Sequence, residues 1–192
     1  MTLISSDPLL GKGKRRTFLS GLTLSATAIA LLAGNEKLGL VGRAAAQTAN
    51  NDVTILNSAL GAEQQAIAAY QLGAESGLLQ QAVKDLAVQF QGHHKAHAEA
   101  LAKAVSKLGG KPAMPLKDYG FPKDKLKSQN DVLGFAASLE KGAVSAYLGA
   151  VPILADRELA KAAASILGDE AMHWAVLRYA LGQNPVPGAF VS

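Results

Sequence analysis

The 192-residue sequence contains no cysteine, which excludes disulfide scaffolds, thiolate metal sites, iron–sulfur clusters and cysteine nucleophiles. Aromatic residues make up only 5% of the chain, and runs of β-branched residues are scarce, whereas alanine is abundant. This composition argues against a β-sandwich or a β-barrel and favours helices. The length suits one domain and a processed segment, with no room for a second full domain.

Most of the chain also lacks a net charge. The formal net charge is +4, but residues 1–46 hold six lysines and arginines against two acids. The rest of the sequence holds 13 basic and 13 acidic side chains. A basic patch for phosphate groups is therefore not supported, and we expect no nucleic-acid partner.

Residues 1–46 have the organisation of an export signal. A basic cluster that includes Arg15 and Arg16 is followed by an apolar stretch over residues 18–34, diluted with serine, threonine and glycine. Three alanines at residues 44–46 then offer a small-residue cleavage site. The two arginines and the apolar stretch resemble the twin-arginine export signal, which a receptor reads as an address.

The sequence thus predicts a signal segment at residues 1–46 and a domain at residues 47–192. The expected location is periplasmic or otherwise exported. The twin-arginine resemblance implies export of a folded protein, often one loaded with a cofactor. The alternative is a retained N-terminal membrane helix, which is disfavoured because the apolar stretch is short and contains polar residues. Only in that case do we expect contact with a membrane.

Four further stretches have helical periodicity. From residue 53, apolar side chains recur at spacings of three, four and seven residues, which is typical of an amphipathic helix. We expect Asp52 and Asp156 to cap the first and the last helix. The helices are expected at residues 52–75, 78–108, 131–150 and 156–181.

A long connection separates the second helix from the third. Residues 109–130 contain three prolines and little periodicity, and such a connection is longer than compact domains normally tolerate. Fully extended, it exceeds the roughly 36 Å length of a 24-residue helix. The pattern of short, long and short connections predicts an all-α four-helix bundle with one long crossover between helices two and three.

The two halves of the domain repeat a glutamate–tyrosine pattern. Tyr70 follows Glu63 by seven residues, and Tyr147 follows Glu140 by the same interval. The offset between the halves is 77 residues. We expect both tyrosines to be core residues that donate hydrogen bonds to the carboxylates.

The second and fourth helices repeat a second pattern. A shift of 76 residues places His94 on Glu170 and His97 on His173. Duplication of this kind usually brings equivalent residues to face each other around a pseudo-two-fold axis. Another histidine, His93, lies four residues before His97 on roughly the same face and is a competing ligand. The preferred interpretation is a partly exposed histidine beside the ligand set.

These ionisable residues lie on the apolar stripes of their helices. An unpaired buried carboxylate would cost several kcal/mol, so each must be protonated, ion-paired or bound to a metal. No lysine or arginine shares the stripes. Oxygen and nitrogen donors suit iron, manganese or zinc. The candidate metal ligands are Glu63, His94, His97, Glu140, Glu170 and His173.

With these residues in place, residues 52–182 resemble the ferritin-like superfamily, and in particular exported ferritin-like bacterial proteins, some of them desiccation-related. The superfamily pattern is one glutamate from each of two helices and Glu-x-x-His from each of the other two. By this resemblance Glu63 and Glu140 are terminal carboxylates and Glu170 is a bridging carboxylate. The terminal nitrogen ligands are His97 and His173.

The sequence departs from that pattern at His94, which stands where the second bridging glutamate is expected. A carboxylate can bridge two ions through its two oxygens, but a neutral imidazole offers one lone pair to one ion. The departure favours a single ion, or an asymmetric pair, over a regular di-iron site.

The expected function is an exported metal-binding protein that holds iron, or manganese, and reacts with oxygen or peroxide in stress protection. Ferroxidase or peroxide-reducing activity would follow from that chemistry, and the sequence leaves a homo-oligomer open. One alternative is a metal-free structural or partner-binding protein, in which the polar cluster is a hydrogen-bond network. Another is an enzyme that acts on an organic substrate at the same site.

Overall fold

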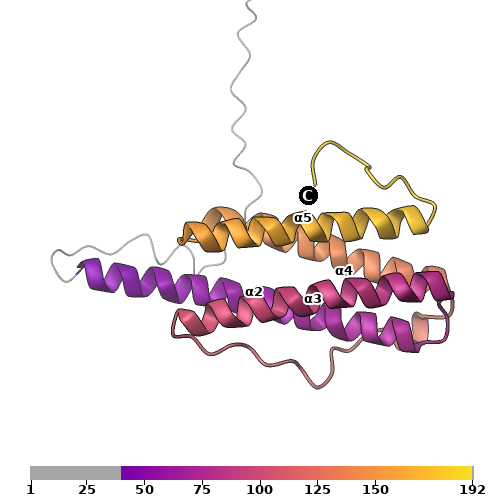
Figure 1. The fold of residues 1–192 in the computed structure, drawn as a ribbon, viewed down its shortest axis with the longest axis horizontal. Helices are drawn as coiled ribbons and strands as arrows, with labels where there is room; N and C mark the ends of the chain where they lie inside the picture. Colours follow the sequence, from indigo (N-terminus) through magenta and orange to yellow (C-terminus); the bar gives the residue numbers. More distant parts are fainter. Residues whose placement is uncertain (1–39, 192) are drawn as a thin grey trace, which may run out of the picture. The chain divides into compact units, whose positions relative to one another are not determined.

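The structure is a computed structural model and describes residues 40–191. Within this range it contains four α-helices, two short 3₁₀ turns and no strand. The elements are α2 (Leu40–Glu75), α3 (Gln81–Lys107), η1 (Lys123–Lys125), α4 (Gln129–Ala150), η2 (Val151–Ile153) and α5 (Arg157–Ala180). The predicted all-α four-helix bundle with a long crossover is therefore confirmed (Figure 1). No helix in the described part combines the length and the apolar composition that a membrane span requires.

Two helical hairpins build the bundle. A short turn joins α2 to α3, η2 joins α4 to α5, and the long connection between α3 and α4 runs along the α2–α3 pair (Figure 1). Side chains of α2 hold this connection in place. Asn57 donates to the carbonyl of Lys111 and accepts from the amide of Ala113, at 3.1 and 2.7 Å. Gln64 donates to the carbonyl of Ala113 at 2.8 Å. These bonds satisfy backbone groups that an irregular segment leaves free.

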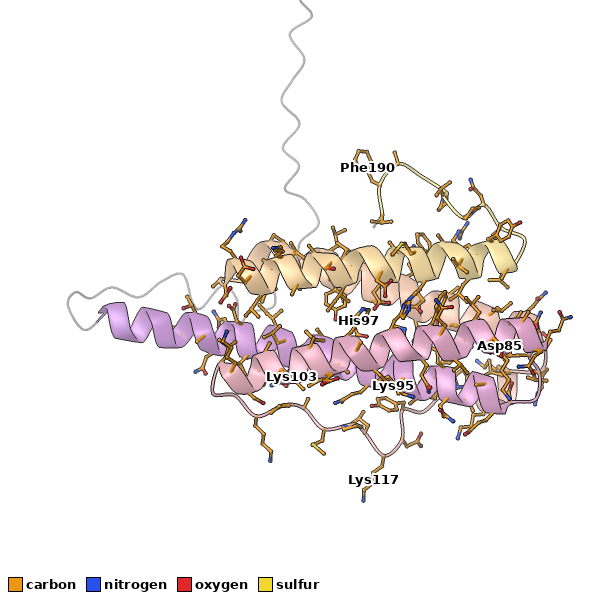
Figure 2. The ribbon with its side chains drawn as sticks, in the orientation of Figure 1. Asp85, Lys95, His97, Lys103, Lys117 and Phe190 are labelled. Carbon is orange, nitrogen blue, oxygen red and sulfur yellow. The ribbon has the colours of Figure 1, made fainter. Side chains whose placement is uncertain are left out.

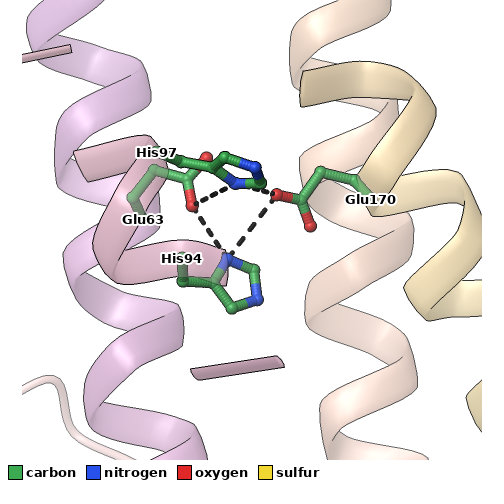
Figure 3. A group of neighbouring side chains, drawn as sticks. All are labelled: Glu63, His94, His97 and Glu170. Carbon is green, nitrogen blue, oxygen red and sulfur yellow. Dashed lines mark hydrogen bonds and ion pairs between the residues drawn. The ribbon is translucent and has the colours of Figure 1, made fainter. Parts of the chain in front are cut away.

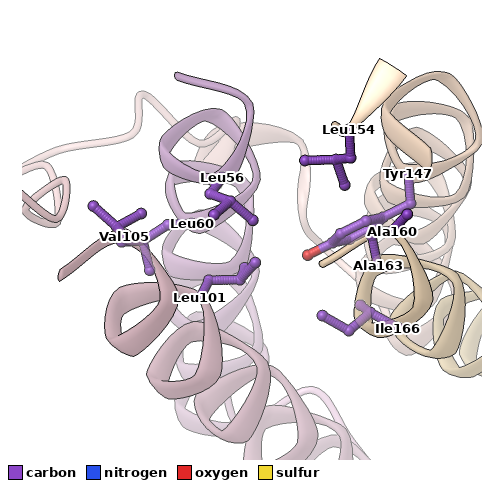
Figure 4. Close-up of a cluster of buried hydrophobic side chains, with 9 residues drawn as sticks. All are labelled: Leu56, Leu60, Leu101, Val105, Tyr147, Leu154, Ala160, Ala163 and Ile166. Atoms are coloured by element: carbon purple, nitrogen blue, oxygen red, sulfur yellow. The ribbon is translucent and has the colours of Figure 1, made fainter. Parts of the chain in front are cut away.

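The core has two apolar clusters with a polar layer between them. Along every helix, a buried histidine or glutamate separates the residues of one cluster from the residues of the other. In α3, for example, Phe90 and Leu101 lie on either side of His94. One cluster consists of Leu56, Leu60, Leu101, Val105, Tyr147, Leu154, Ala160, Ala163 and Ile166 (Figure 4). The other consists of Tyr70, Ala87, Phe90, Leu133, Ala137 and Leu177. Burial of each large apolar side chain stabilises the fold by roughly 1.5–3 kcal/mol.

The ends of the helices lie within three residues of the expected positions, except at the start of the bundle. The prediction that Asp156 caps α5 is confirmed, because its side chain accepts from the amides of Glu158 and Leu159 at 2.8 and 3.3 Å. The last helix ends at Ala180, one residue before the expected end. The second helix begins at Gln81, three residues later than expected.

The prediction that Asp52 caps the first helix is wrong. The helix α2 already begins at Leu40, because its alanine-rich first turns favour helix without showing apolar periodicity. The Asp52 side chain is buried within α2 and accepts from the amides of Ala155 and Asp156, at 2.9 and 3.0 Å. It thereby ties α2 to the segment that leads into α5.

Most of the predicted export signal lies outside the described residues. Its last part, residues 40–46, forms the beginning of α2 and includes the three alanines of the predicted cleavage site. The signal and the exported location stay predictions.

Candidate metal centre

The structure brings all six predicted ligands together in the polar layer of the bundle. One carboxylate comes from α2, one from α4 and one from α5, while α3 supplies two imidazoles and α5 a third. Five of the six side chains are at most 2% exposed, and His97 is 15% exposed. Figure 2 shows His97 between α3 and α5, whereas Lys103 and Lys117 lie on the outside.

The first group of ligand atoms belongs to Glu63, His94, His97 and Glu170 (Figure 3). The Oε2 atom of Glu63 lies 2.8 Å from Nδ1 of His94 and 3.5 Å from Nδ1 of His97. The Oε1 atom of Glu170 lies 3.0 Å from Nδ1 of His97 and 3.5 Å from Nδ1 of His94. All four ligand atoms lie within 4.8 Å of one another.

The second group consists of His94, Glu140, Glu170 and His173. Nε2 of His94 lies 3.2 Å from Oε1 of Glu140. Nδ1 of His173 lies 3.5 Å from the same oxygen and 3.4 Å from Oε2 of Glu170. The two groups share His94 and Glu170, and Glu170 turns a different oxygen toward each. This is the arrangement that a bridging carboxylate requires.

Two tyrosines fix the outer carboxylates across the repeat. The hydroxyl of Tyr147 donates to Oε1 of Glu63 at 2.5 Å, and the hydroxyl of Tyr70 donates to Oε1 of Glu140. Each half of the sequence thus supplies the tyrosine that bonds the glutamate of the other half. Burial, together with the nearby glutamate charge, raises the pKa of both tyrosines, so both stay protonated donors.

Several buried ligand-type atoms have no hydrogen-bond partner. They are Nδ1 of His97, Nδ1 of His173, Oε2 of Glu140 and both carboxylate oxygens of Glu170. Among residues 47–191, no lysine or arginine pairs with the three carboxylates. Buried polar atoms are nearly always hydrogen-bonded, so each such atom requires an explanation. Among the described residues, the ion pairs of these atoms are all with other members of the cluster, at 3.0–3.5 Å. Carboxylate oxygens and imidazole nitrogens that converge in this way fit a divalent ion with oxygen and nitrogen ligands.

The family model for the ferritin-like domain matches residues 51–183. The chain belongs to the ferritin-like family. No curated protein matches it. A solved structure of a conserved hypothetical protein from Mycobacterium tuberculosis is similar over 74% of this chain and 99% of its own, at 21% identity and a TM-score of 0.65. Another, described as a ferritin-like, diiron-carboxylate protein from Bacillus anthracis str. Ames, covers 70% of this chain and 97% of its own, at 23% identity and a TM-score of 0.61. Both likenesses support the ferritin-like fold.

The negative charge of this ferritin-like centre keeps its histidines protonated when no metal is bound. Burial lowers the pKa of His94, but the bonded carboxylates of Glu140 and Glu63 outweigh it and raise that pKa to about 10. The same balance raises the pKa of His97 and of His173 to about 9. An ion that binds these nitrogens must therefore displace protons.

The pKa values of the three carboxylates shift in different directions. Burial raises the pKa of Glu63 and of Glu140, but neighbouring histidines more than compensate, and the net shift of each pKa is downward. Burial prevails at Glu170 and raises its pKa. The carboxylates of Glu63 and Glu140 are therefore ionised at neutral pH without any ion.

The sequence analysis missed Asp169. Its Oδ2 atom lies 3.2 Å from Nδ1 of His93 and 3.3 Å from Nε2 of both His97 and His173. Its position four residues before His173 was a usable signal, because such pairs share a helix face. His93 is partly exposed, as expected, and it lies outside the two groups that contain the six predicted ligands. It belongs instead to a third group of ligand-type atoms, with Asp169 and His173.

Gln91 is another buried polar residue that the sequence analysis missed. It donates to the carbonyl of Ile67 and to the side chain of Gln71, at 3.0 and 2.8 Å, and accepts from Lys95 at 2.8 Å. These bonds join α3 to α2 beside the centre. Lys95 therefore bonds a glutamine and does not neutralise the carboxylates of the centre.

Proposed function

We propose that the protein binds iron, or manganese, in the polar layer of its bundle through the six clustered glutamates and histidines. The observation that carries this proposal is Glu170, which is fully buried, has two oxygens that accept no hydrogen bond and turns one of them toward each ligand group. The Bacillus anthracis neighbour, described as a diiron-carboxylate protein, has the same fold and supports this assignment.

The three carboxylates and His94 favour one ion, or an asymmetric pair. Three ionised glutamates supply a charge of −3, so two divalent ions would leave an excess of +1 for a hydroxide to balance. The imidazole of His94 faces one group with Nδ1 and the other with Nε2, and when neutral it can bind an ion through only one of them. The first ion is therefore expected to bind more tightly than any second one.

Bound iron would supply redox chemistry toward oxygen or peroxide. The protein's own residues hold the site in shape. The two tyrosines orient the carboxylates of Glu63 and Glu140. On the outer side of the centre, Oδ2 of Asp169 lies 3.3 Å from Nε2 of both His97 and His173. The apolar clusters on either side keep bulk water out. Together with the export signal expected at residues 1–46, this supports a protective role against oxidants outside the cytoplasm.

The proposal is tested by anaerobic titration with Fe(II), followed by exposure to air. The wild type is expected to bind about one ion or more per chain and to show iron oxidation on exposure to air. Glu170→Ala should abolish tight binding, because it removes the carboxylate whose two oxygens face the two ligand groups. Glu158→Ala is the matched control, an exposed acid on the same helix. Equal binding by wild type and Glu170→Ala would refute the assignment.

A metal-free role is the second candidate, and the hydrogen bonds of His94 favour it. A protonated His94 bonds Glu63 at 2.8 Å and Glu140 at 3.2 Å, and so joins α2, α3 and α4 without an ion. In this case metal content stays well below one per chain after supplementation with iron, manganese or zinc. The thermal stability is then also independent of added metal.

A further inference from the structure

A third group of potential ligand atoms lies on the outer side of the centre, between α3 and α5. It consists of Nδ1 of His93, Oδ2 of Asp169 and Nε2 of His173. The two nitrogens are 2.9 Å apart, and the oxygen lies 3.2 and 3.3 Å from them. We infer that these three residues form a second, outer site for a divalent cation, through which the buried centre is loaded. This inference rests on the proposed function.

The donor set suits such an ion. Two imidazoles and one carboxylate are the ligands that divalent transition metals take up, with water in the remaining positions. Nε2 of His97 lies 3.3 Å from the same Asp169 oxygen and adds a third nitrogen. Within residues 47–191, the ion pairs of Asp169 are all with histidines, and no lysine or arginine is paired with it.

The exposure of the side chains decreases from the outer site to the buried centre. His93 is 38% exposed and Asp169 23%, whereas His173 is 2% exposed and Glu170 is fully buried. The tyrosine hydroxyls cover the terminal carboxylates on other sides. An ion that arrives from solvent therefore meets His93 and Asp169 before it reaches Glu170.

His173 connects the two sites. Its Nε2 faces Asp169, and its Nδ1 faces Glu140 and Glu170. A neutral imidazole has one lone pair and one N–H, so His173 can bind an ion on only one side at a time. When Nε2 binds an ion, Nδ1–H faces the buried carboxylates. When Nδ1 binds, Nε2–H faces His93 and Asp169. The outer ion must therefore give up His173 before the inner ion can use it, which makes the outer site a temporary one.

The test uses Co(II), which is spectroscopically visible and stable in air at simple nitrogen and oxygen sites, and measures binding with no activity assay. The double variant Glu63→Gln/Glu140→Gln weakens the buried centre and leaves the three outer ligands unchanged. We expect this variant to bind about one Co(II) per chain. Adding His93→Ala should weaken that binding by about tenfold or more. The matched control is Gln89→Ala, an exposed residue one turn earlier on α3.

If the double variant binds no Co(II) while the wild type does, the outer site is refuted and the proposed function stands. The same holds if His93→Ala and Gln89→Ala bind equally well. If the wild type binds no Co(II), both proposals fail. Should the double variant not fold, the rate of Co(II) loading is measured by stopped flow in protein that is otherwise wild type. His93→Ala should slow loading about tenfold, and Gln89→Ala should leave the rate unchanged. Equal rates for the two variants would refute the inference.

Discussion

Metal binding is expected to release protons from the histidines of the centre. Without metal, the pKa of His94 is about 10 and those of His97 and His173 are about 9. All three are therefore charged at pH 7. An ion in either ligand group binds His94 and one further histidine, and both must lose a proton. The first ion should therefore release about two protons.

The number of released protons sets how steeply the metal affinity depends on pH. Two released protons make the apparent affinity rise about a hundredfold per pH unit, or about 2.7 kcal/mol, until the pH approaches the histidine pKa values. Anaerobic calorimetry with Mn(II) between about pH 6.5 and 8, in buffers of different ionisation enthalpy, measures both the affinity and the proton number. In His94→Glu, where a carboxylate replaces one imidazole, the number should fall to about one.

A proton number near zero would refute the reasoning. It would mean that the ion binds exposed carboxylates, which are already deprotonated at neutral pH. A number of about one in the wild type would show that His94 keeps its proton and is not a ligand.

Three further changes have defined outcomes. Asp52→Ala leaves two backbone amides before α5 without their acceptor and should lower the free energy of unfolding by about 2 kcal/mol in urea denaturation; an unchanged value would contradict this tie. Tyr147→Phe removes the donor to Glu63 and should weaken metal binding about tenfold, and equal affinity would show that the bond does not orient this ligand. Folding raises the pKa of His94 from its ordinary value to about 10, so the protonated His94 stabilises the metal-free protein fully below about pH 6.5 and loses this contribution as the pH rises through about 10. The thermal melting temperature should therefore fall between about pH 7 and 10, and a constant melting temperature would contradict the raised pKa.

The sequence predicted the helices and the six clustered residues because both depend on local spacing. Helical periodicity placed Glu63 and Glu140 on buried stripes, and the shift of 76 residues paired His94 with Glu170. In a four-helix bundle, buried positions at the same level of different helices converge. The cluster therefore followed from periodicity and repetition.

Contacts between distant segments could not be predicted in this way. Asp52 bonds amides more than 100 residues away, and no pattern near it indicates that partner. Asp169 acquires its significance from His93 and His97, which approach it only when α3 packs against α5. The crossed tyrosine–glutamate bonds likewise depend on the packing of α2 against α4.

The central claim is that Glu170 and the inward nitrogens of His97 and His173 hold an ion inside the bundle. Anomalous diffraction from manganese-loaded crystals tests it most directly, because it locates the ion without reference to activity. The account predicts a peak at bonding distance from a Glu170 oxygen and from Nδ1 of at least one of the two histidines. Peaks confined to surface carboxylates, with Glu170 free of any ion, would contradict it.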